Sequence, residues 1–204
     1  MNVRWVVAAV LLTLAAGAVQ ADTSKAKAAK PQAMDPKAMQ EMMVKAAATG
    51  PQHEILKKLE GEWDLVVRSM MDPSQPPTET KSHSVIRTLM DGRYCQEESA
   101  GDFQGMPFTG MGITGYDNVL KKYVSIWIDN MGTGIMTSQG TMDATGKVIT
   151  WTGESSDPMT GKPSKVRMVT HITDDNHHTF EMYARGPDGK EMKMMEISYT
   201  RHGV

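Results

Sequence analysis

Residues 123–129 read Tyr-Val-Ser-Ile-Trp-Ile-Asp, and this stretch shows how the chain is organised. Val124, Ile126 and Ile128 occupy every second position and alternate with aromatic or polar residues. Successive side chains of an extended chain point to opposite faces, so this period of two predicts a β-strand with two different faces. The same alternation continues through most of the chain after Gly61, which predicts a protein built mainly of strands.

Ten strands are expected after Gly61, each separated from the next by a short turn. The turns carry the Gly, Pro, Asn and Asp residues that tight turns require. The connections are too short to hold the crossover helices that parallel strands need, so the sheet must be antiparallel. The predicted strands are 62–71, 78–90, 93–100, 107–116, 122–130, 134–142, 147–155, 164–173, 177–185 and 191–201.

Ten consecutive hairpins form a meander, and a meander avoids bare edge strands best by closing on itself. The sequence therefore predicts an all-β fold, an antiparallel up-and-down barrel of about ten strands. A barrel of this size can enclose a small ligand. A sandwich of two sheets is the alternative architecture.

Two short helices are expected before the barrel. Asp35 and the proline after it are typical of a helix start, and Gly50 is typical of the residue after a helix end. Met39, Met42 and Met43 fall on one face of this first helix, which we expect to dock against the barrel. A second helix begins at the next proline and ends before Gly61.

The first residues of the chain indicate export. A basic residue, Arg4, precedes an apolar run at 5–16 and a Val-Gln-Ala motif ending at residue 21. This layout predicts a cleaved signal peptide at 1–21 and a protein that is periplasmic or secreted, with an uncleaved anchor as the alternative. Residues 22–33 are polar and predicted to be a disordered tether. Residues 34–204 suit a single barrel domain with no membrane span after cleavage.

The charge and cysteine content exclude several classes of protein. The chain holds 22 basic and 24 acidic residues, with no dense basic run, so nucleic acid is not an expected partner. Cys95 is the only cysteine, so the protein forms no internal disulfide. The oligomeric state is left open.

The first and the last predicted strands together carry a lipocalin-like signature. Gly61-Glu62-Trp63 opens the first strand and Tyr199-Thr200-Arg201 ends the last. This pairing resembles the lipocalin kernel, in which the arginine packs over the tryptophan and seals the barrel floor. The resemblance implies that Trp63 and Arg201 have a structural role and lie in contact.

A resemblance to a more specific family extends over nearly the whole mature chain. Several short sequence motifs follow a methionine-rich helix in a fixed order. Taken together, they resemble an uncharacterised family of exported bacterial proteins known as DUF1579. The resemblance implies a lipocalin-like barrel and supplies no activity, substrate or functional residue. The motifs are Thr49-Gly50-Pro51-Gln52-His53, Leu59-Glu60-Gly61-Glu62-Trp63, Asp91-Gly92-Arg93, Gly115-Tyr116-Asp117, Trp127-Ile128-Asp129, Asp157-Pro158-Met159-Thr160-Gly161 and Asp188-Gly189-Lys190-Glu191.

The main functional hypothesis is binding of a small apolar or amphipathic ligand inside the barrel, since interior pockets are the usual sites in such folds. Aromatic side chains give most area to apolar pockets, and histidine can orient a ligand near neutral pH. The alternating residues of each strand form two rows, and the sequence leaves open which row faces inward. For the strand at 122–130 we choose the row of Trp127 over that of Val124. The predicted ligand-binding residues are Trp127, Trp151, Phe108, Tyr116, Tyr183, His83 and His178.

Three other functions stay open at this stage, and no cofactor or metal ligand is assigned. An enzyme would need an inward histidine or carboxylate, the strand candidates being Glu97, Glu98, Asp129, Glu154 and Glu181. Haem would need one inward imidazole from His83, His171 or His178. Copper would need clustered methionines, the candidates being Met34, Met39, Met42 and Met43, followed by Met192, Met194 and Met195. A structural envelope protein would hold no ligand. No His-x-x-x-His motif or cysteine pair predicts zinc.

Overall fold

A computed structural model describes residues 35–72, 74–103, 105–157, 160–186 and 188–204. The predicted signal peptide and the predicted tether lie outside the described residues. No helix in the described part of the chain has the length and apolar character needed to cross a membrane.

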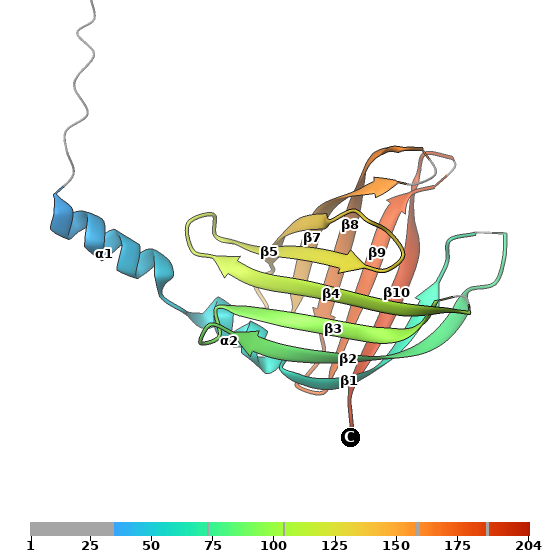
Figure 1. Ribbon diagram of the computed structural model, residues 1–204, viewed down its shortest axis with the longest axis horizontal. Helices are drawn as coiled ribbons and strands as arrows, with labels where there is room; N and C mark the ends of the chain where they lie inside the picture. Colours follow the sequence, from blue (N-terminus) through green and yellow to red (C-terminus); the bar gives the residue numbers. More distant parts are fainter. Residues whose placement is uncertain (1–34, 73, 104, 158–159, 187) are drawn as a thin grey trace, which may run out of the picture.

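The described residues form two helices followed by ten strands (Figure 1). All strands pair antiparallel with their chain neighbours, and β1 also pairs with β10, so the sheet closes into an up-and-down barrel. The predicted barrel is confirmed, and the alternative of two packed sheets is wrong. The elements are α1 (Pro36–Ala47), α2 (Pro51–Lys58), β1 (Gly61–Ser69), β2 (Thr78–Leu89), β3 (Tyr94–Phe103), β4 (Met106–Asp117), β5 (Lys122–Asp129), β6 (Met136–Met142), β7 (Val148–Asp157), β8 (Lys162–Ile172), β9 (His177–Arg185) and β10 (Glu191–Arg201).

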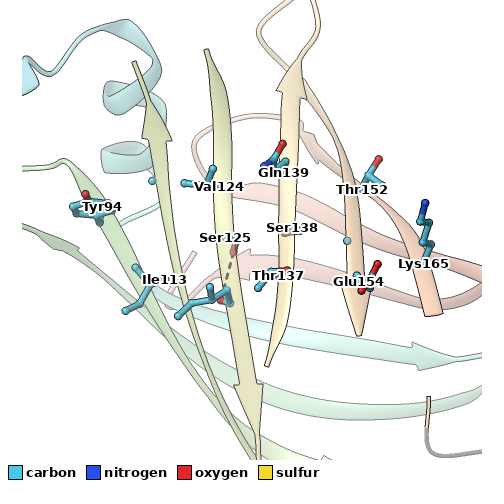
Figure 2. Close-up of a pocket in the computed structure, with 13 residues that line it drawn as sticks. Tyr94, Ile113, Val124, Ser125, Thr137, Ser138, Gln139, Thr152, Glu154 and Lys165 are labelled. Carbon is cyan, nitrogen blue, oxygen red and sulfur yellow. Dashed lines mark hydrogen bonds between the residues drawn. The ribbon is translucent and has the colours of Figure 1, made fainter. Parts of the chain in front are cut away.

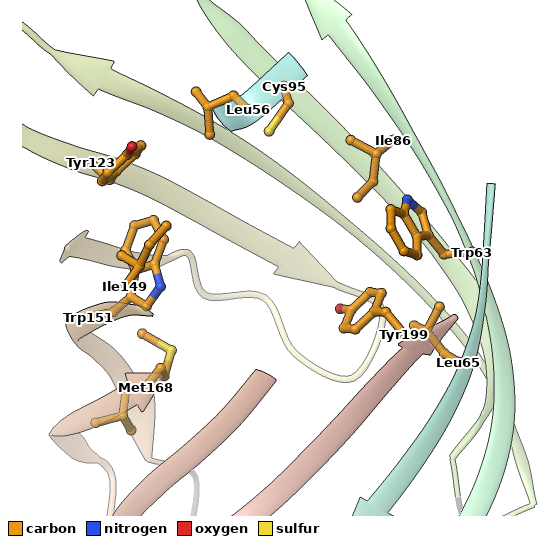
Figure 3. Close-up of a cluster of buried hydrophobic side chains, with 11 residues drawn as sticks. Leu56, Trp63, Leu65, Ile86, Cys95, Tyr123, Ile149, Trp151, Met168 and Tyr199 are labelled. Atoms are coloured by element: carbon orange, nitrogen blue, oxygen red, sulfur yellow. The ribbon is translucent and has the colours of Figure 1, made fainter. Parts of the chain in front are cut away.

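The fully buried side chains gather inside the barrel at the end next to α2 (Figure 3). Leu56 of α2 is 1% exposed and contributes to this cluster, while the rest comes from alternate positions of the strands. Because the strand positions differ by two, they all point to the inner face. The cluster comprises Leu56, Trp63, Leu65, Ile86, Cys95, Tyr123, Ile149, Trp151, Val166, Met168 and Tyr199.

Arg201 closes this end of the barrel. Its guanidinium carbon lies 4.4 Å from the centre of the Trp63 ring, which is the contact expected from the sequence. The same guanidinium donates hydrogen bonds to the backbone carbonyls of Lys58, Glu60 and Asp175, at 2.8 to 3.0 Å. Lys58 and Glu60 lie at the end of α2, where carbonyl groups have no partner within the helix, so Arg201 caps α2.

Gly61 makes room for this cap. Its φ angle is +136°, a conformation that other residues rarely adopt, and a Cβ atom there would lie 2.4 Å from the Arg201 guanidinium. The glycine of the Gly-x-Trp signature is therefore required by the backbone conformation and by the close approach of Arg201.

The first helix does not dock on the barrel, contrary to the sequence prediction. Asp35 caps α1 as expected, through a hydrogen bond from the Lys37 amide, but no residue of α1 is buried. The helix extends away from the barrel (Figure 1), and Met39, Met42 and Met43 are 48%, 51% and 67% exposed. Ala48 at its end has an extended backbone, which directs α1 away from the strands.

Removing the Arg201 cap should destabilise the barrel. We expect Arg201→Gln to lower the free energy of unfolding by roughly 2–3 kcal/mol, because the cation–π contact and the carbonyl hydrogen bonds are lost together. Chemical denaturation measures this change. The exposed Arg185 is the matched control, and a loss after Arg185→Gln equal to that after Arg201→Gln would show that the cap has no special role.

The exposed methionines of α1 should contribute little to stability. We expect the combined change of Met39, Met42 and Met43 to glutamine to alter the free energy of unfolding by less than about 0.5 kcal/mol, as surface changes do. Leu56→Ala in the docked helix α2 is the positive control and should cost about 2–4 kcal/mol. A loss of that size in the methionine variant would mean that α1 packs on the barrel in solution.

Candidate ligand site in the barrel interior

The aromatic row chosen from the sequence faces the barrel interior. Trp127 shares its strand face with Tyr123, which is fully buried, whereas Ile126 and Ile128 on the other face are 42% and 37% exposed. The inner face also holds Trp151, Phe108 and Tyr116 by the same alternation from buried core residues. Four of the five predicted aromatic wall residues therefore lie inside the ring of strands.

Glycines on neighbouring strands let the indoles of Trp127 and Trp151 pack closely against the wall. A Cβ atom at Gly112 or Gly110 of β4 would lie 2.9 or 2.4 Å from the Trp127 ring. A Cβ atom at Gly140 of β6 would likewise lie 2.6 Å from the ring of Trp151. The alternating glycines of β4 thus serve close packing, because each side-chain-free position is covered by a ring from the next strand.

Two of the predicted ligand-binding residues point outward instead. Tyr183 lies on the outer face, where the Arg167 guanidinium stacks on its ring at 3.9 Å and its hydroxyl donates to Glu181. His83 lies directly opposite Asp64 on the outer face of β1 and β2. A ring can therefore lie on the outer row of a strand as well as on the inner row, so the presence of rings alone could not identify the inner row.

A carboxyl group, Glu97 of β3, lies inside the barrel and is held by three hydroxyl groups. Its Oε1 accepts hydrogen bonds from Ser84 at 2.8 Å, from Ser99 at 3.2 Å and from the Tyr199 hydroxyl at 3.2 Å. Burial raises the pKa of Glu97 above its usual value, although the three hydroxyl donors act in the opposite direction. No hydrogen bond among the described residues ends on Oε2, so this oxygen is free to meet another group.

Glu97 and Trp127 lie in the same row across three strands. Glu97 pairs with Gly112 of β4, and Gly112 pairs with Trp127 of β5. Because glycine has no side chain, nothing from β4 stands between the carboxyl group and the indole in this row. Glu97 also keeps some accessible surface despite its interior position. The pair offers an aromatic surface beside a carboxyl oxygen, the combination by which pockets bind molecules with an apolar body and a polar end.

His178 lies beneath this pair, between the floor of the barrel and Tyr199. Its ring stacks on Tyr199 with the centres 4.1 Å apart and meets Trp63 edge-on at 4.5 Å. The residue is 5% exposed, and its Nδ1 atom has no hydrogen-bond partner among the described residues. Burial, helped by the nearby charge of Arg201, lowers the pKa of His178 to about 4, so its imidazole is neutral near pH 7.

Cys95 also lies in the interior, and its environment makes it unreactive. Burial, together with the charge of Glu97, raises the pKa of this thiol to about 12. The thiolate is the reactive form of cysteine, and almost none is present near neutral pH. Cys95 is therefore a packing residue of the core.

The remaining acid, histidine and methionine candidates are spread over the molecule. Asp129 faces inward and accepts a hydrogen bond from the Trp127 indole, whereas Glu98, Glu154 and Glu181 lie on the outer row of their strands. His171 is outward and faces Glu181 at 4.0 Å. The methionines of α1 make no contact with β10 in the described structure, so the two groups proposed for copper are not brought together.

The end of the barrel away from α2 is less tightly filled. Inner-face side chains at this end are half-buried, in contrast to the fully buried cluster around Trp63. The half-buried residues include Val67, Phe108, Met136, Met182 and Met195.

A groove on the outer face is a second candidate, with a volume of about 530 Å³ (Figure 2). Its floor includes the outward side chains of Ile113, Val124 and Ile126. Its charged side chains, Glu154 and Lys165, lie at one end of the groove and do not converge on its floor. The interior site combines a raised carboxyl pKa, three converging hydroxyls and aromatic walls, and it is therefore the stronger candidate.

A family model described as a protein of unknown function, DUF1579, matches residues 48–201. The chain belongs to the DUF1579 family. No curated protein sequence matched the chain.

Among solved structures, this DUF1579 protein is similar to the crystal structure of Rv2717c from M. tuberculosis. The two share 17% sequence identity with a TM-score of 0.56, over 76% of this chain and 99% of that one. A redesigned β-barrel matches with 11% identity and a TM-score of 0.39, over 72% of this chain and 94% of that one. The likeness to Rv2717c supports the barrel fold.

Sequence reasoning named Glu97 as one of five acids and missed the hydroxyl groups that hold it. Ser84 and Ser99 are isolated serines in strands, and nothing in their spacing distinguishes them from exposed serines. The one usable signal is the alternation along each strand, since residues two apart lie on the same face. Ser84 is two residues from Ile86, and Ser99 is two residues from Glu97. Tyr199 is brought to Glu97 only by closure of the barrel.

The lowered pKa of His178 predicts a loss of stability in acid. Between pH 6.5 and 4 the unfolded chain protonates this histidine while the folded protein does not, so the free energy of unfolding falls as the pH falls. The total loss should be about 3 kcal/mol. His178→Phe should remove this part of the pH dependence, as measured by denaturation across the range.

The exposed His177 provides the control for this experiment. His177→Gln removes a half-exposed imidazole next to His178 and should leave the decline that comes from the buried His178 in place. A His178→Phe variant with an unchanged decline would show that His178 is protonated within the folded barrel.

Proposed function

We propose that this DUF1579 protein is a binding protein whose barrel interior holds a small amphipathic ligand, with the polar end of the ligand at Glu97. The observation that carries the proposal is the placement of Glu97, whose Oε1 is fixed by three hydroxyl donors. This arrangement leaves Oε2 as the acceptor for an incoming group. A fixed carboxyl group in an apolar interior is a strong means of orienting a ligand, because little reorganisation is needed on binding.

The walls supply the apolar part of this recognition. Trp127 lies in the same row as Glu97, and Phe108 and Met136 continue the inner face towards the far end. A ligand that enters at that end would place its apolar body against these side chains before its polar end reached Glu97. The predicted signal peptide adds the proposal that binding takes place outside the cytoplasm.

The ionised form of Glu97, which a cationic ligand end would stabilise, discriminates between the possible polar ends of a ligand. A negatively charged ligand end would meet a carboxylate in a poorly solvated interior, where like charges repel strongly. An amine would form a charge-assisted hydrogen bond with the same carboxylate, and an alcohol would form a neutral one. We therefore expect the order of affinity to be amine, then alcohol, then carboxylate.

Three probes with one alkyl chain test this order, namely dodecylamine, dodecanol and dodecanoate. Each is titrated into the full chain below its critical micelle concentration while the fluorescence of tryptophan is followed, since Trp127 lies beside the proposed site. Glu97→Gln should weaken dodecylamine binding by about tenfold or more and should reduce the difference between the amine and the carboxylate, because the interior charge is removed.

Glu98 gives a control one residue away with the same chemistry. It lies on the outer face and pairs with Arg87 at 3.1 Å, so Glu98→Gln should leave all three affinities unchanged. Equal weakening in both variants, or no binding of any probe, would contradict interior binding at Glu97. The second outcome would favour a barrel filled by its own side chains.

An enzyme that uses Glu97 as a general acid or base is the second candidate. The raised pKa of this carboxyl favours it, since a group that titrates closer to neutral pH exchanges protons more effectively. A binding protein and an enzyme would differ in what happens to the ligand. An enzyme would release a chemically altered ligand, which mass spectrometry of the ligand detects, and Glu97→Gln would stop this conversion while binding persisted. The inward histidine of the haem alternative, His178, is enclosed by Trp63 and Tyr199, which does not favour haem binding.

A further inference from the structure

A group of metal-ligand side chains meets on the outer surface near the closed end of the barrel. Asp64 of β1, His83 of β2 and His202, which follows β10, each place a ligand atom within 4.8 Å of the others. The Nδ1 atom of His202 lies 3.0 Å from a carboxylate oxygen of Asp64, and the Nδ1 atom of His83 lies 3.7 Å from the other oxygen. Both imidazoles therefore point a ring nitrogen at one carboxylate.

Three strands hold these residues in place. Asp64 pairs directly with His83 across β1 and β2. The backbone amide of His202 donates a hydrogen bond to the carbonyl of Glu62 at 2.9 Å, which fixes the start of the C-terminal segment against β1. Trp63 lies between Glu62 and Asp64 in the chain and points into the core, so its two neighbours must point outward. The rigid floor of the barrel thus fixes the position of the surface group.

We propose that Asp64, His83 and His202 form a binding site for a divalent transition-metal ion such as Zn²⁺. Two imidazole nitrogens and one carboxylate oxygen form a donor set that suits zinc and the neighbouring first-row ions. Around a tetrahedral zinc ion with bonds of about 2.0–2.1 Å, ligand atoms lie roughly 3.3 Å apart. The present separations require only small rotations of exposed side chains to reach that geometry.

Glu62 adds an independent observation in favour of the site. While Nδ1 of His83 faces Asp64, the other ring nitrogen, Nε2, lies 3.8 Å from the carboxylate of Glu62. Histidines that bind metals usually direct their second nitrogen at a carboxylate, which fixes the tautomer and makes the ligand more basic. Glu62 would hold His83 in this way and is a positioning residue of the proposed site.

The ion would fasten the end of the chain to the barrel. His202 follows Arg201, the residue that caps α2 and covers Trp63, so a metal bond at His202 would secure the segment that carries the cap. Three protein ligands leave at least one coordination position of the ion for water, since zinc takes four or more ligands. This site is on the outer face and does not depend on the ligand proposed for the interior.

Zinc binding to the full chain, purified without a polyhistidine tag, tests the proposal. Calorimetric titration with Zn²⁺ should give one site per chain, and the midpoint temperature of unfolding should rise in its presence. His83→Gln, His202→Gln and Asp64→Asn should each raise Kd at least tenfold, and Glu62→Gln should raise it roughly tenfold through His83. All four side chains are solvent-accessible, so these variants are expected to fold.

Cobalt and a control histidine make the result specific. Co²⁺ in place of Zn²⁺ should give visible absorption bands whose intensity falls in the His83→Gln variant, which a change in stability alone would not produce. His171 has similar exposure, also faces a carboxylate and lies on a different part of the outer surface, so His171→Gln should leave Kd unchanged. Absence of stoichiometric binding, or binding that survives both His83→Gln and His202→Gln, would overturn the proposal.

Discussion

The cap that Arg201 forms at one end of the barrel is the interaction on which the rest of the structure depends. One guanidinium group covers the Trp63 ring and binds the carbonyls of Lys58, Glu60 and Asp175, so the last strand, the helix α2 and the turn before β9 are joined. A barrel closed by β1 and β10 has no free edge, but its two ends still need covering. The cap covers one end, whereas the inner side chains at the other end are half-buried.

The difference in burial between the two ends of the barrel determines the surroundings of the interior side chains. Side chains near the cap are fully buried, and Glu97 lies above them, where the packing gives way to half-buried residues. His178 and Tyr199 connect the floor to the carboxyl group by stacking and by a hydrogen bond. The same burial that raises the pKa of Glu97 lowers that of His178, because a poorly solvated interior disfavours both charges. The chemistry of the interior therefore follows from its closure at one end.

The strand that builds the floor also builds the outer metal-ligand group. Trp63 points inward, so Asp64 points outward and meets His83 and His202. The proposed interior site and the proposed metal site thus lie on opposite faces of the sheet and share no residue. A shift of the β1 register by one residue would turn Trp63 outward and Asp64 inward, and so would disrupt both the floor of the barrel and the outer group.

The sequence by itself determined the barrel and the two helices, because alternation, turn residues and helix caps are local signals that the final fold obeys. The contact between Trp63 and Arg201 was implied by the resemblance to the lipocalin kernel. The sequence left open which alternating row of each strand faces inward. The structure places Trp127 inside and Tyr183 outside, since the facing of a strand is fixed only when the strand is paired. The docking of α1 was predicted wrongly, because an apolar stripe shows what a helix could bury and not whether a surface lies within reach. Only the tertiary structure brought Tyr199 to Glu97 and His202 to Asp64, because closing the barrel joins residues that lie far apart in the chain.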